Sequence, residues 1–395
     1  MDTILVANAG SSSLKFELFA VGSGLTKLVK GHVEGIGTAP YFIVKDAGGD
    51  KIVDKRYSSS EVPDLSSAMH RVGMWLREQH EGELVAVGHR VVHGGAEYGR
   101  PVRVDRRVLE DLERYIPLAP LHQPNNLALI ETLLELRPDL PQIACFDTAF
   151  HRGHDPVTDH YAIPAHFFAE GVRRYGFHGL SYEYVAGRLQ EIAPDIARGR
   201  VIVAHLGNGA SLCAMRDGRS QECTFGFTAL DGLPMGTRCG QIDPGVLLYL
   251  IEQGKMSSSD LQDMLYNESG LKGLSGISND VRDLLASEDP GAILALDHFV
   301  HRISLNAGSL AAALGGLDAF VFTAGIGENS PVMRERIATK LAWLGAQLDP
   351  MRNENGETRL STDDSKVGLY LVPTDEELMI ARHTHGVITE SNSSL

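Results

Sequence analysis

The feature that most restricts the fold of this chain is a short pattern that occurs twice, 198 residues apart. Residues 4–7 align with residues 202–205, and in both places a turn of small residues and a second β-prone run follow. A strand, a turn and a strand in this order are typical of a β-hairpin. Because a pattern repeated at half the chain length indicates an internal duplication, we predict two copies of one α/β domain. The length of 395 residues suits two or three domains of about 100–200 residues each.

Helical and extended patterns alternate through the rest of the chain. Apolar residues recur at helical spacing in four segments: 65–79, 125–136, 291–314 and 374–383. Short β-prone runs occupy four others: 84–92, 142–146, 319–322 and 369–372. Residues 325–329 follow one of these strands, and Pro331 suits the first turn of a helix after them. The alternation of strands and helices predicts an α/β fold.

Charge and composition exclude several classes of protein. With 51 acidic against 36 basic side chains, the net charge of −15 disfavours a nucleic-acid partner. The four cysteines lie far apart without a Cys-x-x-Cys pair, so they encode neither a disulfide framework nor a zinc ribbon. Residues 1–8 carry no basic region typical of a secretion signal. The longest apolar stretch, 310–325, is interrupted by Asp318 and is shorter than the roughly 20 residues that span a bilayer. We expect a cytoplasmic protein that binds neither nucleic acid nor a membrane.

Three glycine-containing turns are chemically suited to an anion such as phosphate. Residues 8–15, Asn-Ala-Gly-Ser-Ser-Ser-Leu-Lys, combine turn amides, hydroxyls and one ammonium group. Residues 205–209 lie at the equivalent place in the second copy, and residues 325–329 join a strand to a helix. Ordinary serine-rich or glycine-rich turns explain each segment as well. Because P-loop and dinucleotide fingerprints are both absent, a nucleotide site here requires another scaffold.

Nine motifs resemble those of acetate kinases and occur in order over nearly the whole chain: residues 8–15, 88–95, 117–122, 146–151, 174–179, 205–209, 236–240, 325–329 and 373–378. The resemblance implies the duplicated ribonuclease-H-like fold of actin and the sugar kinases. It implies domains at 1–150 and 151–383, with a tail at 384–395 that packs back on the first. It also implies ATP and ADP as co-substrates, Mg²⁺ with Mn²⁺ as an alternative, and a homodimer.

The reaction of this family places an anion next to an anion. A carboxylate with a pKa near that of Glu, about 4.3, is already a nucleophile at neutral pH and needs no base. Catalysis should therefore depend on alignment and on cations around the transferring phosphoryl group. By resemblance, Arg90 binds the substrate, Arg238 is the catalytic arginine, and His178 stabilises the transition state. Without the resemblance they would be two surface arginines and a packed histidine.

Asp147 and His122 are further active-site residues by resemblance. Asp147 follows a β-prone run, a position typical of functional carboxylates; a cap for the next turn is the alternative. Because the substrate acid needs no deprotonation, we interpret Asp147 as the orienting partner of an arginine. His122 would otherwise be an ordinary loop histidine.

The start of the last helix carries the predicted metal residue. Thr374 and Glu377 read as a capping box, which leaves Glu376 free. By resemblance Glu376 and Asn8 place Mg²⁺, a cation that takes one or two protein oxygens; an acidic residue serving the helix dipole is the alternative. The resemblance assigns the remaining nucleotide-binding residues as follows: Ser11, Ser13, Lys15, His205, Leu206, Gly207, Asn208, Gly209, Asp280, Val281, Arg282, Gly325, Ile326, Gly327, Glu328 and Asn329.

The chain departs from the family pattern in the acyl pocket and near His178. The pocket residues by resemblance are Val92, Leu121, Phe177 and Ala229. Ala229 stands where acetate kinases commonly have Pro, so we expect a larger pocket in which propionate is used nearly as well as acetate. This chain has Leu180 and Tyr182 where the family has Thr and His. It has Arg-Gly-His at residues 152–154 where the family has Gln-Thr-Met, and Gln123 where the family has Asn.

We therefore expect reversible, in-line transfer of the ATP γ-phosphoryl group to acetate. A propionate or butyrate kinase is the near alternative. An actin-like nucleotide switch that hydrolyses ATP without an acceptor is the alternative from another class.

Overall fold

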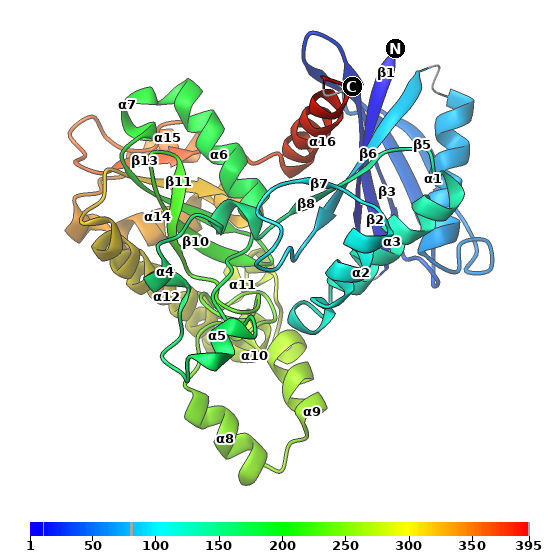
Figure 1. The fold of residues 1–395 in the computed structure, drawn as a ribbon. Coiled ribbons are helices and arrows are strands. Elements are labelled where there is room, and N and C mark those ends of the chain that lie inside the picture. Colours follow the sequence, from blue (N-terminus) through cyan, green and yellow to red (C-terminus); the bar gives the residue numbers. More distant parts are fainter. Residues whose placement is uncertain (11, 80–81, 394–395) are drawn as a thin grey trace. The chain divides into compact units, whose positions relative to one another are not determined.

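The computed structural model describes residues 1–10, 12–79 and 82–393, so the predicted residue Ser11 lies outside the described part. The chain divides into two compact units: Met1–Ala149 with Asp375–Leu395, and Phe150–Thr374 (Figure 1). The first boundary lies one residue from the expected one. The second lies at Asp375 and not at residue 384, because helix α16 (Glu376–Ser393) is continuous and packs on the sheet of the first unit.

The first unit contains an eight-stranded sheet in the order β5-β4-β3-β2-β1-β6-β8-β7. Its strands are β1 (Asp2–Ala9), β2 (Ser13–Val21), β3 (Leu25–Glu34), β4 (Tyr41–Asp46), β5 (Lys51–Arg56), β6 (Glu83–Val91), β7 (Val102–Arg103) and β8 (Gln142–Phe146). Strand β1 pairs antiparallel with β2, as the sequence predicts, and parallel with β6, which pairs parallel with β8.

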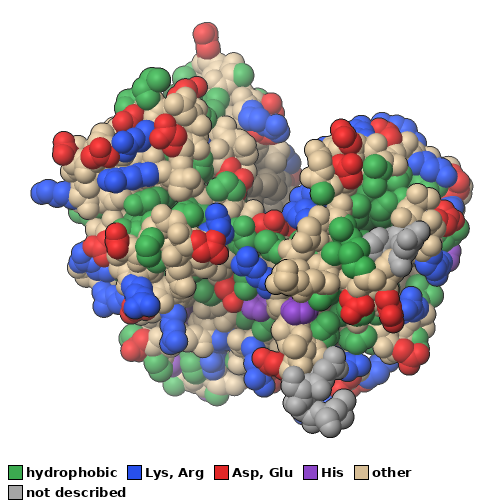
Figure 2. Space-filling model, turned by 90° about the horizontal axis from the view of Figure 1, so that it is seen from above, with side chains coloured by type: hydrophobic (Ala, Val, Ile, Leu, Met, Phe, Trp, Pro, Cys, Tyr) green, Lys and Arg blue, Asp and Glu red, His purple; other side chains and the backbone are tan. Residues whose placement is uncertain are grey.

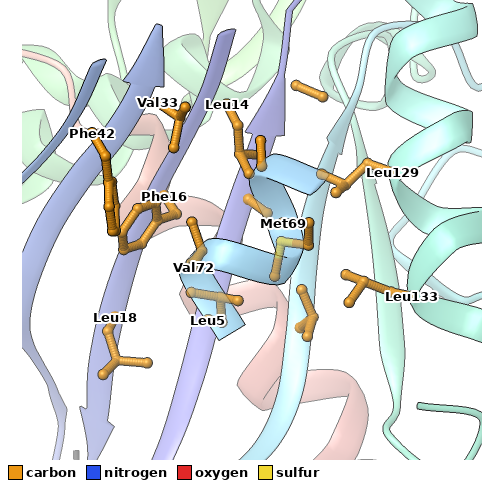
Figure 3. Packing of buried hydrophobic residues seen from close by; sticks show 14 of the residues in the cluster. Leu5, Leu14, Phe16, Leu18, Val33, Phe42, Met69, Val72, Leu129 and Leu133 are labelled. Atoms are coloured by element: carbon orange, nitrogen blue, oxygen red, sulfur yellow. The ribbon is translucent and has the colours of Figure 1, made fainter. Parts of the chain in front are cut away.

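Helices cover both faces of this sheet. They are α1 (Leu65–Gln79), α2 (Arg106–Glu113), the short η1 (Ile116–Leu118), α3 (Gln123–Leu136) and α16. On one face, Leu5 and Leu18 of the sheet pack against Met69 and Val72 of α1 and Leu133 of α3 (Figure 3). On the other face lies α16, and a Cβ on Gly88 of β6 would lie 2.3 Å from the Thr384 hydroxyl. Successive residues of a strand face opposite sides, and the central residues 4–7 of β1 and 84–88 of β6 are apolar or glycine on both sides.

The second unit repeats the central part of that topology. Its five-stranded sheet has the order β11-β10-β9-β12-β13, with β9 (Arg200–Leu206), β10 (Ala210–Arg216), β11 (Arg219–Cys223), β12 (Ala319–Thr323) and β13 (Gly368–Leu371). Strand β9 pairs antiparallel with β10 and parallel with β12, which pairs parallel with β13. The duplication predicted from the repeated hairpin is confirmed, since β9 and β10 occupy the places of β1 and β2.

Helices also cover both faces of the second sheet. Helix α6 contributes Tyr182, Val185 and Leu189 to one hydrophobic cluster, and the long α12 packs on β9, β10 and β11. Asp289 caps the start of α12, Pro290 occupies its first turn, and Gly315 ends it in the left-handed conformation. The helices of this unit are η2 (Ala149–His151), α4 (Pro156–Asp159), α5 (His166–Ala169), α6 (Gly179–Ile192), α7 (Pro194–Ala197), α8 (Pro244–Glu252), α9 (Ser258–Asp263), η3 (Met264–Glu268), α10 (Gly270–Ser275), α11 (Val281–Leu285), α12 (Pro290–Leu314), α13 (Ala324–Asn329), α14 (Pro331–Lys340), η4 (Ala342–Leu344) and α15 (Pro350–Glu354).

The predicted capping box at the last helix is wrong. The Asp375 side chain accepts a hydrogen bond from the Leu378 amide, so Asp375 caps α16. The Thr374 hydroxyl is buried without a hydrogen-bond partner among the described residues. The reason is that the Thr374 amide donates to the Glu328 carboxylate, which holds Thr374 in the segment before the helix.

The surface carries both signs of charge. On the face drawn in Figure 2, basic and acidic side chains are interspersed and no continuous basic area is visible. Among the described helices, none combines the length and the hydrophobicity needed to cross a membrane.

Candidate active-site residues

In the first unit, Arg90 and Asp147 form a mostly buried ion pair at the carboxyl ends of two parallel strands. Arg90 lies near the end of β6 and Asp147 directly follows β8. Arg90 Nη2 donates to Asp147 Oδ2 at 2.7 Å, and Arg90 Nε lies 3.2 Å from each carboxylate oxygen. Burial opposes the charge of Arg90, but Asp147 and then Glu376 raise its pKa above the ordinary value. Asp147, which is 1% exposed, therefore holds Arg90 in one orientation.

The predicted metal residues lie at the same end of this sheet. Glu376 is the first residue of α16, and its Oε2 is 3.6 Å from Arg90 Nε. Burial raises the pKa of Glu376, while the charge of Arg90 opposes this shift. Asn8 is half-buried near the end of β1, where it pairs across the hairpin with the exposed Lys15. The oxygens of Asn8 and Glu376 are ligands of the kind that Mg²⁺ prefers.

The other predicted residues of this unit are placed as follows. Val92 is buried, and its amide donates to the Asn126 side chain. Leu121 and His122 are half-buried at the start of α3, and Ser13 is half-buried at the start of β2. Gln123, where the family has Asn, is buried and donates to the carbonyl oxygens of His93 and Leu112.

In the second unit, the structure brings three predicted segments to one cavity of about 630 Å³. Its lining residues are Gly207, Asn208, Asn279, Asp280, Val281, Arg282, Leu285, Gly325, Ile326, Asn329, Ser330 and Pro331. Asp280 caps α11 and pairs with Arg282, which lowers the pKa of Asp280 to about 2. Asn279 also lines the cavity, although it was not predicted from the sequence. It donates to the Asn208 side chain at 3.2 Å, and the one available signal was its position next to Asp280.

Among the predicted nucleotide residues of the second unit, five do not line this cavity: His205, Leu206, Gly209, Gly327 and Glu328. Glu328 instead accepts hydrogen bonds from the amides of Ala324 and Thr374, so it ties the β12–α13 turn to the segment after β13. Leu206 is fully buried and the His205 ring stacks on His178, with 3.9 Å between ring centroids.

His178 and Arg238 converge on Gly209, in the turn between β9 and β10. A Cβ on Gly209 would lie 3.2 Å from His178 Nε2 and 4.0 Å from Arg238 Nη2. Arg238 Nη1 donates to the carbonyl oxygen of Ala229 at 3.0 Å, which orients the guanidinium. His178 caps α6 in the left-handed conformation with φ 59°, a conformation that a non-glycine residue adopts only when its surroundings hold it.

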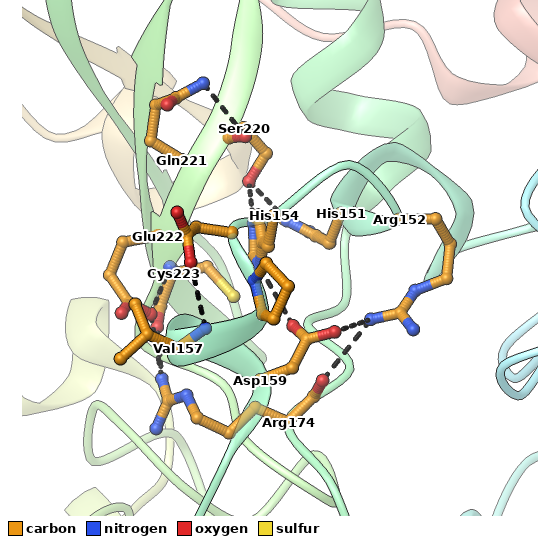
Figure 4. Close-up of polar contacts among 12 residues, drawn as sticks. His151, Arg152, His154, Val157, Asp159, Arg174, Ser220, Gln221, Glu222 and Cys223 are labelled. Carbon is orange, nitrogen blue, oxygen red and sulfur yellow. Dashed lines mark hydrogen bonds and ion pairs between the residues drawn. The ribbon is translucent and has the colours of Figure 1, made fainter.

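Figure 4 shows a polar network in which His151 and His154 both contact Ser220. His151 also holds Phe177, the residue before His178. Burial lowers the pKa of His151 to about 3, so its ring is neutral at pH 7. His151 Nε2 donates to the carbonyl oxygen of Phe177 at 3.0 Å, and its Nδ1 accepts from Ser220. His154, one of the departures from the family, also bonds Ser220, and lies 3.4 Å from Asp159. Phe177 itself is buried edge-on against Phe225.

The sequence is similar to that of known proteins over nearly its whole length. Residues 3–382 match the sequence profile of the Acetokinase family. The acetate kinase of Nitrobacter hamburgensis is 60% identical over 396 residues, covering 100% of this chain and 98% of its own, and that of Rhizobium meliloti is 58% identical over 100% of both.

Two solved structures share the fold over 98% of this chain and 100% of their own. They are the acetate kinase of Porphyromonas gingivalis, with a TM-score of 0.88 and 36% identity, and a propionate kinase from Francisella tularensis, with a TM-score of 0.91 and 38% identity. The fold is thus the two-domain α/β fold of these kinases, and the chain belongs to the acetokinase family.

Proposed function

We propose that this protein is an acetate kinase, which transfers the γ-phosphoryl group of ATP reversibly to acetate and forms acetyl phosphate and ADP. The observation that carries the proposal is the convergence of His178 and Arg238 on Gly209, in the turn whose neighbours Gly207 and Asn208 line the cavity. Full-length relatives at 58–60% identity that are acetate kinases support it. Because ATP is the co-substrate, we place the reaction in the cytoplasm.

The residues have distinct roles in this reaction. A carboxylate oxygen of acetate attacks the γ-phosphorus, the bond to the bridging oxygen breaks, and its electron pair leaves with ADP. No proton has to move, since the acid is already ionised. Arg90, held by Asp147, binds the carboxylate. Arg238 and His178 stabilise the charge on the transferring group, where preorganised donors contribute most.

We further propose that Asn8 and Glu376 hold Mg²⁺, with Mn²⁺ as an alternative. When bound with the nucleotide, the cation neutralises phosphate charge. Among the described residues there is no group of three or more His, Cys, Asp or Glu that could hold a metal ion by itself. Mg²⁺ usually takes one or two protein oxygens and completes its shell with phosphate and water.

Trapping with hydroxylamine tests the proposed activity, because acetyl phosphate reacts with it to give acetohydroxamate. We expect hydroxamate only when ATP, Mg²⁺ and acetate are all present. Release of phosphate from ATP at the same rate without acetate, and no hydroxamate, would instead support a nucleotide switch of the actin type.

A Gly209→Ala variant is expected to lower kcat at least about tenfold, because the added methyl group would lie 3.2 Å from His178 Nε2. Initial-rate kinetics measure the loss. The matched control is Gly187→Ala in α6, where a Cβ meets nothing within 4 Å. The control should keep full activity and gain about 0.5–1 kcal/mol in the free energy of unfolding. Equal activity of the two variants would contradict the placement of His178.

Ala229 gives a prediction about the acyl group. A Pro ring at this position should narrow the pocket, and one methylene in an apolar pocket is worth about 1–3 kcal/mol. We therefore expect the ratio of kcat/KM for propionate to that for acetate to fall at least about tenfold in Ala229→Pro. In the wild-type protein, the kcat/KM values for propionate and acetate should differ by less than about a hundredfold. A ratio that the substitution leaves unchanged would contradict the assignment of Ala229.

We also propose that the protein is a homodimer. Helix α8 has no buried residue, and it exposes Val246, Leu248, Tyr249 and Ile251. Large exposed apolar residues on one short helix are typical of an interaction surface. Light scattering should give twice the chain mass of 42.8 kDa. In a Leu248→Glu/Tyr249→Glu variant the single-chain mass is expected, whereas an unchanged dimer would exclude α8 from the interface.

A further inference from the structure

Tyr182, one of the departures from the family pattern, is linked to His178 by hydrogen bonds through the hydroxyl group of Ser211. Tyr182 lies one turn after His178 in α6 and is fully buried. Its hydroxyl oxygen is 2.5 Å from Ser211 Oγ on β10, and Ser211 Oγ is 2.9 Å from His178 Nδ1. Ser211 is also fully buried, so both hydroxyl groups must find their hydrogen-bond partners inside the protein.

The direction of these hydrogen bonds follows from the partners of Tyr182. Burial raises the pKa of Tyr182 well above 10, so the phenol keeps its proton. Among the described residues, Ser211 Oγ is the acceptor within hydrogen-bond distance of the buried phenol, so the phenolic proton is donated to Ser211. The Ser211 oxygen therefore accepts from Tyr182, and its own proton is directed at His178 Nδ1. A neutral imidazole that accepts at Nδ1 carries its proton at Nε2.

The Nε2 atom is the one that faces the proposed site of phosphoryl transfer, beside Gly209 and Arg238. The stacked ring of His205 and the edge contact with Phe225 set the plane of the His178 ring. Neither contact distinguishes one ring nitrogen from the other. The hydroxyl pair of Tyr182 and Ser211 does so, because it places a donor at Nδ1.

We propose that Tyr182 is a positioning residue that acts through Ser211 to hold His178 as the neutral tautomer with its proton on Nε2, from which it donates to the transferring phosphoryl group. The tautomer is a property of the resting protein, whereas the donation rests on the proposed kinase function. A neutral imidazole can stabilise a developing oxyanion in this way.

Nitrogen-15 NMR of the histidine rings tests the tautomer without any assay of activity. The His178 signals are assigned from their absence in His178→Asn. We expect Nδ1 to be unprotonated and Nε2 to be protonated in the wild-type protein, and Nδ1 to gain protonation in Ser211→Ala. A proton on Nδ1 in the wild-type protein would overturn the proposal, even if the enzyme proved to be a fully active acetate kinase.

Kinetics test the link from Tyr182 to catalysis. We expect Tyr182→Phe to lower kcat about tenfold to a hundredfold, the usual effect of losing a residue that orients a functional group, with KM for ATP changed less than about twofold. The same change made in a His178→Ala background should lower kcat no further, because its effect acts through His178. Equal losses in the two backgrounds would show a general structural role and overturn the proposal.

Two further variants distinguish the effect of losing the Tyr182 hydroxyl group from the effect of changing the packing of its ring. Tyr370→Phe is the matched control, since Tyr370 packs against the same hydrophobic cluster, and it should leave kcat unchanged. Tyr182→His restores a side chain that donates hydrogen bonds, and it should recover part of the activity lost in Tyr182→Phe. If Tyr182→Phe fails to fold, Ser211→Ala in the wild-type and His178→Ala backgrounds provides the same comparison.

Discussion

An Arg238→Leu variant is expected to lose about a thousandfold in kcat while it binds ATP nearly as well as the wild-type protein. The guanidinium lies beside Gly209 and is oriented by the Ala229 carbonyl oxygen, so we expect it to be preorganised for the transferring phosphoryl group. The chain has a net charge of −15, so the positive field between two anionic reactants has to come from a few local side chains. Initial rates give kcat, and equilibrium dialysis or calorimetry gives the affinity for ATP.

Arg219→Leu is the control for this experiment. Arg219 is an exposed arginine at the start of β11, in the same unit, and the substitution removes the same charge from the chain. The control should keep kcat within about twofold, because a distant exposed charge is screened by solvent. Equal losses in both variants would mean that net charge and not the position of Arg238 sets the rate.

Asp147→Asn is expected to lower the free energy of unfolding by about 3 kcal/mol and to raise KM for acetate at least tenfold. The amide keeps the shape of the side chain but leaves the mostly buried Arg90 without its closest counter-charge. Arg90 then has Glu376 as its remaining partner, at 3.6 Å, and its guanidinium is expected to turn toward that residue and away from the carboxylate substrate. Urea denaturation and initial-rate kinetics measure the two effects.

Asp54→Asn provides the comparison for stability. Asp54 pairs with Lys51, but both side chains are about half exposed, and exposed pairs contribute about 0–1 kcal/mol. A loss in Asp147→Asn no larger than in Asp54→Asn would contradict the interpretation that Asp147 holds a mostly buried cation. An unchanged KM for acetate would remove Arg90 from the carboxylate site.

Local patterns in the sequence predicted the central elements of the fold well. The bounds of α1 and β8 coincide with the predicted 65–79 and 142–146, because helical apolar spacing marks α1 and a short apolar run marks β8. The start of α16 could not be predicted, since Thr374 and Asp375 are both good caps. The choice depends on the bond from the Thr374 amide to Glu328, which lies 46 residues away in the sequence.

The site was predictable only where a motif is local. The resemblance pointed to Arg90 and Asp147, but their pairing depends on two parallel strands that are 57 residues apart. Ser211 was absent from the predicted site because its partner His178 lies 33 residues away and meets it only after β10 joins the sheet. Glu328, which is predicted to bind nucleotide, accepts hydrogen bonds from two backbone amides, and motif matching could not reveal this supporting contact.

Helix α16, which packs on Gly88, affects how the chain folds during synthesis on the ribosome. The second unit is one uninterrupted segment, but the first is completed by residues 375–395, which follow the second unit in the chain. Until α16 has been synthesised and leaves the exit tunnel, one face of the N-terminal sheet lacks the helix that packs on it. Because nascent chains with exposed apolar strands aggregate readily, the growing polypeptide should need chaperone protection until α16 has formed.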